Sequence, residues 1–215
     1  GFHYENPSRR PTRAVGTVGG NSVPVVIVPV LDGKVPAPQP GRTEPDFYYT
    51  GRNLPPAGLR PQGPGYLVDA DLWQGEDNTY PVFTKEQLMF IPTCRARMKF
   101  LFLTYLMLDD ETKALLRTDP SVVLIVQSNH ANRLGEQRAL VHELWREGVG
   151  NPVVFFEHYA LGADDADAFR LQAAADTGAL LFDGLCDGLF LFAQTPQGSE
   201  PLSEAVCDDL ALIHL

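Results

Sequence analysis

The sequence is poor in cysteine, and the spacing of the few cysteines excludes two common uses of this residue. Only Cys94, Cys186 and Cys207 occur among 215 residues, and no two of them form a CxxC pair. An odd and widely spaced set is not typical of a disulfide framework or of a structural zinc site. We therefore expect a protein of a reducing compartment with no metal site of its own.

Long hydrophobic runs and an excess of positive charge are also missing. The longest apolar stretch, residues 98–108, contains Lys99 and Thr104 and is too short to cross a bilayer. The arginines near the N-terminus lead into glycine and proline, so we expect no signal peptide. The formal net charge is −10, which disfavours phosphate backbones and anionic lipids. We expect neither a nucleic-acid partner nor a membrane partner.

Familiar catalytic and nucleotide-binding motifs are absent as well. No GxGxxG, GxxxxGK[ST] or GxSxG sequence occurs. Residues 16–20 are rich in glycine, but they precede a predicted strand instead of a helix N-terminus that could hold a phosphate. The motifs thus support no dinucleotide site, P-loop or serine hydrolase.

Proline and charge divide the chain near residue 64. Twelve of the 18 prolines precede residue 65, a density that prevents helices. Residues 1–64 carry a net charge of +3 and residues 65–215 a net charge of −13. We interpret 1–64 as an extended Pro/Gly-rich segment that packs on the body 65–215 of a single domain, or else serves as a docking surface. Its one predicted strand, 23–31, contains Pro24 and Pro29, which favour an edge position.

From residue 65 onward, strand and helix patterns alternate with short loops. The predicted strands are 99–105, 121–127, 152–158, 179–182 and 189–193, and weaker signals suggest a strand within 65–73 and a helix at 85–90. The predicted helices are 109–117, 135–147, 203–215 and one that begins at Asp164 or Asp165 and ends at Gly178. This order predicts an α/β fold with a parallel sheet, either open and doubly wound or closed as a (β/α) barrel.

Polar side chains that follow the predicted strands are the candidate site residues, because function in such folds lies at the carboxyl ends of strands. They are Asn129, His130, Glu157, His158, Asp183 and Asp187. Their spacing matches no metal-binding motif, and at most one of Glu157 and His158 can face the mouth of a barrel. Each residue type is also common in turns and loops. From residues alone, the sequence contains no recognisable catalytic constellation.

One stretch resembles a known family. Residues 171–189, Leu-Gln-Ala-Ala-Ala-Asp-Thr-Gly-Ala-Leu-Leu-Phe-Asp-Gly-Leu-Cys-Asp-Gly-Leu, resemble a segment of 4-hydroxy-3-methylbut-2-enyl diphosphate synthase. The most specific part is the turn formed by Asp183, Gly184, Asp187 and Gly188, although Cys186 stands where glycine is expected. The resemblance extends over 99–215 and is thin before residue 99.

The resemblance implies the central insert domain of the three-domain form, a TIM-barrel-like fold that is incomplete or degenerate. It implies a parent oxidoreductase of the non-mevalonate isoprenoid pathway, which opens the ring of 2-C-methyl-D-erythritol 2,4-cyclodiphosphate reductively. The parent's four-iron four-sulfur cluster belongs to a C-terminal domain, and none of the three cysteines here matches its ligands. The expected location is the bacterial cytoplasm, or the plastid of a plant-type host.

Three functions follow as hypotheses. The first is a catalytically inert structural spacer between the substrate barrel and the cluster domain of the same chain. The second is a module by which the basic residues of 1–64 dock onto the cluster domain or onto an electron donor protein. The third is a free-standing (β/α) enzyme that uses Glu157 or His158 together with Asp183 or Asp187.

Overall fold

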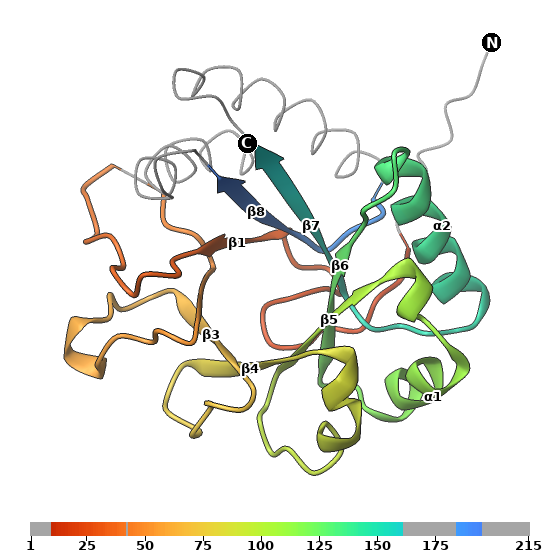
Figure 1. The fold of residues 1–215 in the computed structure, drawn as a ribbon, viewed down its shortest axis with the longest axis horizontal. Coiled ribbons are helices and arrows are strands. Elements are labelled where there is room, and N and C mark those ends of the chain that lie inside the picture. Colours follow the sequence, from red (N-terminus) through yellow and green to blue (C-terminus); the bar gives the residue numbers. More distant parts are fainter. Residues whose placement is uncertain (1–9, 42, 161–183, 195–215) are drawn as a thin grey trace.

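The computed structural model describes residues 10–41, 43–160 and 184–194, which form a closed barrel of eight parallel strands (Figure 1). The strands are β1 (Val25–Pro29), β2 (Phe47–Gly51), β3 (Gly65–Asp69), β4 (Thr79–Phe83), β5 (Lys99–Thr104), β6 (Val122–Gln127), β7 (Val153–Ala160) and β8 (Gly188–Gln194). Each strand pairs in parallel with its neighbours in the sequence, and β1 pairs with β8 to close the barrel. The predicted TIM-barrel-like α/β fold is confirmed, and its set of strands is complete.

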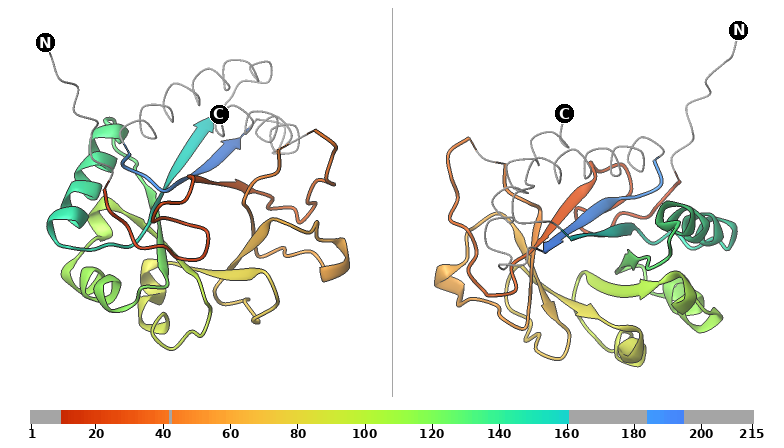
Figure 2. Two further views of the ribbon diagram at one scale, coloured as in Figure 1. Left: turned by 180° about the vertical axis from the view of Figure 1, so that it is seen from behind. Right: turned by 45° about the horizontal axis from the view of Figure 1, so that its top comes forward.

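The outer layer of helices is reduced in the part of the chain that the structure describes. Its two α-helices, α1 (Asp110–Thr118) and α2 (Arg133–Arg146), lie together on one side of the barrel (Figures 1 and 2). The 3-10 helices η1 (Ala57–Leu59), η2 (Lys85–Phe90) and η3 (Tyr105–Met107) are shorter. Prolines in the early connections explain the absence of longer helices there. No described helix is long and apolar enough to span a membrane.

The position predicted for the first strand is wrong. β1 is not an edge strand, because Ile27 pairs with Phe47 of β2 on one side and with Phe190 of β8 on the other. The two prolines are tolerated because Pro24 precedes the strand and Pro29 is its last residue. Closure of the barrel places β8 beside β1 as its second neighbouring strand, and the local sequence of β1 does not predict this pairing.

The barrel crosses the compositional boundary at residue 64. Strands β1 and β2 precede this boundary and lie between β8 and β3, so they belong to the barrel wall. β2 and β4 were not among the predicted strands. The change at residue 64 therefore marks a difference in composition and charge within one continuous sheet.

Most elements predicted after residue 98 are confirmed. The predicted strands 99–105, 121–127, 152–158 and 189–193 correspond to β5, β6, β7 and β8, and the predicted helices 109–117 and 135–147 correspond to α1 and α2. Asp109 caps α1 by accepting a hydrogen bond from Thr112 N, and Gly148 follows α2 with a φ of 68°. The predicted helix ending at Gly178, the strand 179–182 and the helix 203–215 lie outside the described residues.

Two cores alternate along the strands. The outer core joins strand residues such as Leu101 and Leu124 to helix residues such as Leu116 and Leu140. The inner core contains the strand residues of opposite parity, so it fills the barrel interior. Its buried members are Val15, Val18, Val25, Ile27, Phe47, Leu67, Val82, Met98, Phe100, Val123, Ile125, Val154 and Phe190.

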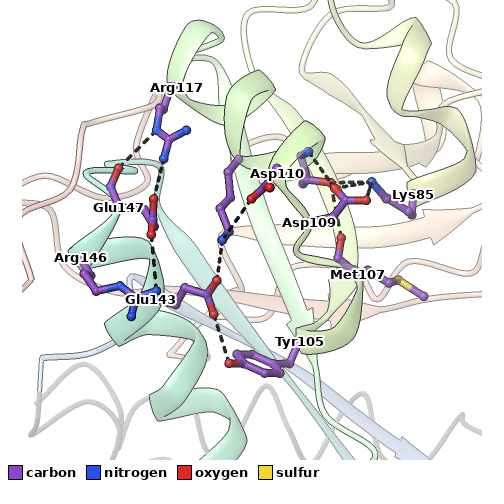
Figure 3. A network of polar contacts seen from close by, with 11 residues as sticks. Lys85, Tyr105, Met107, Asp109, Asp110, Arg117, Glu143, Arg146 and Glu147 are labelled. Atoms are coloured by element: carbon purple, nitrogen blue, oxygen red, sulfur yellow. Dashed lines mark hydrogen bonds and ion pairs between the residues drawn. The ribbon is translucent and has the colours of Figure 1, made fainter.

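A network of charged side chains joins α1, α2 and the helical turns beside them (Figure 3). Lys113 Nζ lies 2.6 Å from Glu143 Oε1, and Tyr105 donates a hydrogen bond of 3.1 Å to the other oxygen of Glu143. Lys85 Nζ lies 2.8 Å from Oδ2 of Asp109 at the start of α1. The two described α-helices are thus fixed to each other by polar contacts as well as by packing.

Candidate functional site

The mouth of the barrel, where the strands end, is the first place to examine. Aromatic side chains from four strands face the interior there: Tyr49, Phe102, Phe156, Phe190 and Phe192. The Phe156 ring centroid lies 5.3 Å from that of Phe102, 5.0 Å from that of Phe190 and 6.0 Å from that of Phe192. Rings at these distances pack against each other and stabilise the interior. This end of the barrel is therefore occupied largely by aromatic packing.

Glu157 and His158 lie on opposite faces of β7, as alternation along a strand requires. His158 is exposed, and its ring stacks on Phe192 with centroids 5.2 Å apart. Glu157 is buried under α2, where Oε1 accepts a hydrogen bond of 2.8 Å from Gln137 and Oε2 lies 2.8 Å from Nε of Arg133. A buried carboxylate held in this way fixes α2 to β7. Glu157 faces the outer layer and not the mouth.

Asn129 and His130 form the turn that follows β6. The Asn129 side chain accepts a hydrogen bond of 3.2 Å from Gln127, and His130 Nδ1 accepts one of 3.0 Å from the backbone N–H of Asn132. Both residues are exposed. These bonds hold the loop before α2, which is the structural role that such residue types have in turns.

A polar pair at the mouth was missed by the sequence reasoning. The hydroxyl of Tyr49, in the middle of β2, donates a hydrogen bond of 2.6 Å to Oδ1 of Asp69, the last residue of β3. Burial, and then the bond to Asp69, raise the pKa of Tyr49 well above its usual range. The phenol therefore stays protonated at neutral pH. The available signal was the aromatic run 47–49 at strand spacing, but nothing in the sequence pairs it with Asp69.

Asp187 lies at the opposite end, the bottom, where the strands begin. Its Oδ1 accepts a hydrogen bond of 2.9 Å from the Thr12 hydroxyl, and its Oδ2 accepts one of 3.0 Å from the backbone N–H of Val153. Its own backbone N–H donates to Val153 O, and its carbonyl accepts from Val25 N. Asp187 is 2% exposed. This one residue joins the N-terminal segment, β1 and β7.

Gly188 completes the closure. A Cβ at this position would lie 2.6 Å from Cγ2 of Val25, 2.7 Å from the carbonyl oxygen of Val25 and 3.2 Å from Cγ2 of Val154. Only a residue without a side chain fits between β1 and β7 at this level. Asp187 and Gly188, two of the four residues of the turn that resembles the family, therefore lie where the barrel closes.

The rest of the resembling turn is described in part. Gly184 has a φ of 63°, a conformation that favours glycine. Cys186, which stands where glycine was expected, does not have a positive φ and is buried in the outer core. The turn therefore needs no glycine at this position. Asp183 lies outside the described residues.

The structure does not bring Asp187, Glu157 and His158 together. His158 pairs with Phe192 and Val154 pairs with Gly188, so Asp187 and His158 lie at opposite ends of the same strand pair. Four residues of strand separate these levels by roughly 13 Å. Glu157 faces the outer layer. Within the described residues, Asp187, Glu157 and His158 form no common site.

The two cysteines that the structure describes do not fit an iron–sulfur cluster. Cys186 is buried in the outer core and Cys94 packs at its margin, while Cys207 lies outside the described residues. Among the residues that the structure describes, no group of three or more His, Cys, Asp or Glu side chains gathers as metal ligands would. Such a cluster needs several thiolates around one centre, and this part of the chain does not offer them.

Comparison with known proteins gives one consistent result. No family model matches the chain. It is 52% identical over 210 residues to a protein of Bacteroides thetaiotaomicron named 4-hydroxy-3-methylbut-2-en-1-yl diphosphate synthase (flavodoxin). Proteins of the same name from Bacteroides fragilis and Phocaeicola vulgatus are 47% and 46% identical.

These matches cover 98% of this chain but only 32% to 33% of each relative. The chain thus spans about a third of the length of the curated relatives it matches. The resemblance found in the sequence is confirmed for a segment of these proteins. It is not limited to 99–215, because the similarity includes the proline-rich first part as well.

Proposed function

We propose that this chain, which is homologous to a third-length segment of 4-hydroxy-3-methylbut-2-en-1-yl diphosphate synthases, is a catalytically inert spacer domain of such an enzyme. In this role it lies between the substrate barrel and the cluster domain and holds them at a fixed separation and orientation. The parent enzyme would open the ring of 2-C-methyl-D-erythritol 2,4-cyclodiphosphate reductively, using an iron–sulfur cluster in its C-terminal domain. Its place would be the bacterial cytoplasm.

The observation that carries the proposal is how the polar side chains of the barrel are used. Asp187 and Glu157 are both buried. Asp187 binds the start of β7 in the barrel wall, and Glu157 binds α2 in the outer layer. At the mouth, where a (β/α) barrel enzyme holds its reacting groups, aromatic rings pack against each other. A domain whose acids serve its own closure is suited to a mechanical role.

The second candidate function is docking of the basic residues of 1–64 onto the cluster domain or an electron donor. The contacts of these residues make this function less favoured than the spacer role. Arg10 and Arg13 bind backbone carbonyls of the barrel, and Arg52 and Arg60 form ion pairs with Asp71 and Glu76. Side chains used in this way are less available to an acidic partner. The name of the relatives includes flavodoxin, so an electron donor remains a partner of the whole enzyme in our proposal.

A flexible joint placed beside the intact domain tests the spacer role. In the full-length enzyme, six Gly/Ser residues are inserted immediately before Gly1, and a second variant carries the same insertion immediately before Gly41, which is exposed. The first insertion lets the preceding domain move independently, and we expect kcat/KM to fall by about tenfold or more because orientation is lost. The second leaves the domain junction rigid and should change kcat/KM by less than about twofold.

Cluster content and thermal unfolding are measured for both variants, so that misfolding is recognised. If the junction insertion leaves kcat/KM at the level of the control insertion, the domain does not act as a rigid spacer.

A further inference from the structure

We propose that residues 10–20, here called the N-terminal strap, are the joint that fixes the direction in which the chain enters the barrel. This inference rests on the spacer function and names the residues that supply its stiffness. The strap crosses the bottom of the barrel and binds three separate connections: the end of α1, the loop between α2 and β7, and the turn before β8. A segment held at several points cannot swivel about any one of them.

Arg13 provides the widest attachment. Its backbone N–H donates a hydrogen bond of 2.7 Å to Gly150 O. Its Nη2 donates to the carbonyl of Leu116 at 3.1 Å and to Oδ1 of Asn151 at 3.0 Å. Asn151 is completely buried and donates in turn to the carbonyls of Asp119 and Val122. One arginine therefore links the strap to α1 and, through Asn151, to β6.

Arg10 makes a second attachment beside the first. Its side chain is buried, and Nη2 donates to Val149 O and, at 3.1 Å, to Asn151 O. Burial lowers the pKa of Arg10 to about 10, while the charge of Asp187 opposes this shift. The guanidinium therefore remains charged at neutral pH. The attachment of Arg10 is therefore made by a charged side chain through the two carbonyls that Nη2 binds.

The middle of the strap inserts into the barrel interior. Val15 and Val18 form an antiparallel bridge, and both side chains are buried in the inner core. The turn returns over Gly20, whose N–H donates to the Thr12 hydroxyl at 3.0 Å, and Thr12 donates in turn to Asp187. The strap is thus fixed by apolar packing and by hydrogen bonds to groups inside the protein, which salt screens weakly.

The test measures orientation directly. In the full-length enzyme, one spin label is placed at position 89, where Met89 is 73% exposed, and another on the surface of the preceding domain. We compare the distance distribution between the labels in the parent, in Arg13→Ala, in the milder Thr12→Val and in the control Arg52→Ala. Arg52 belongs to an exposed ion pair with Asp71 outside the strap.

We expect Arg13→Ala to widen the distribution by about twofold, as a flexible connection would, and Thr12→Val to widen it less. The control should match the parent. Hydrogen exchange of the β6 amides shows that the barrel stays folded, and Thr12→Val serves as the deciding variant if Arg13→Ala unfolds it. Distributions as narrow as that of the parent in the folded strap variants would overturn the inference.

The failure of this inference can be separated from that of the spacer function. If the Gly/Ser insertion before Gly1 lowers kcat/KM but the folded strap variants keep a narrow distribution, the domain is a spacer whose stiffness has another source. If the insertion has no effect, the spacer function itself is wrong, whatever the strap variants show.

Discussion

At the bottom of the barrel, polar side chains bind groups of other elements, whereas the described side chains at the mouth are largely aromatic rings that pack against each other. Asp187, Arg10 and Arg13 are each bonded across the chain to residues more than a hundred positions away. Near the mouth, His158 stacks on Phe192 and Tyr49 binds Asp69. The difference indicates that this domain uses its polar chemistry for closure and attachment. Substitutions at the two ends should therefore differ in their effects on stability.

The largest effect is expected for Gly188→Ala at the bottom. The new Cβ would overlap Val25, including its backbone carbonyl, so β1 and β8 would have to separate. We expect a loss of about 3 kcal/mol or more in the free energy of unfolding, measured by urea denaturation. Gly58→Ala is the matched control, because a Cβ there meets nothing within 4 Å. Equal stability of the two variants would show that the closure is not tight.

The next effect is expected for Asp187→Asn. An asparagine that still accepts from the N–H of Val153 turns its NH2 group toward Thr12, whose hydroxyl can accept from it but then loses the acceptor of its own proton. The loss of this acceptor, and of the negative charge near buried Arg10, should cost about 1 to 3 kcal/mol of unfolding free energy. Asp71→Asn, which removes the partner of exposed Arg52, should be nearly neutral. If Asp187→Asn leaves the free energy of unfolding unchanged, the side chain of Asp187 does not hold the N-terminal segment and β7 together.

A smaller loss of stability per residue is expected when low pH protonates carboxylates of the outer layer. Hydrogen bonds from Lys85 and Thr112 hold the pKa of Asp109 well below its usual range, and Lys113 lowers the pKa of Glu143. Because the folded pKa values are lowered, their stabilising contribution is present above the unfolded pKa values of about 4 and is lost as the pH falls through the folded values. Stability should therefore decline from about pH 4 downward.

The check is the unfolding midpoint in urea between pH 5 and pH 2 for the parent and for Glu143→Gln. The variant lacks one of the titrating groups, so its curve should be flatter over this range. Parallel curves would mean that the contacts of Glu143 do not contribute to the acid dependence.

The smallest effect is expected at the mouth. Tyr49→Phe removes the hydrogen bond to Asp69 but keeps the ring against Phe190. We expect a loss of about 0.5 to 1.5 kcal/mol in the free energy of unfolding by urea denaturation. A loss as large as that of Asp187→Asn would mean that the mouth and the bottom depend on polar contacts to the same extent.

How far the sequence predicts this structure depends on the range of the interactions. Strands β5 and β6 and the helices α1 and α2 follow from local patterns, because apolar runs and caps such as Asp109 act within a few residues. The partners of Thr12 and Arg13 lie on distant parts of the chain, so no local pattern predicts the strap. For the same reason β1 was taken for an edge strand, since its pairing with β8 joins the two ends of the described chain.

The candidate site was predictable only in its residue types. Strand alternation correctly separates Glu157 from His158. The Asp-Gly turn was singled out by resemblance, but its role in closure depends on Val25 and Val153, which only the folded chain places beside it. The pair Tyr49–Asp69 depends in the same way on the neighbouring positions of β2 and β3.

The most direct test of the central claim is the activity of a variant that changes the mouth alone. The full-length enzyme carrying Tyr49→Phe, Asp69→Asn and His158→Ala is assayed with the cyclodiphosphate and a reduced electron donor, with cluster content and folding confirmed. If this domain supplies no reacting group, kcat/KM should stay within about twofold of the parent value. A fall of about a hundredfold or more in the folded, cluster-containing variant would show that the mouth takes part in catalysis and would contradict the account.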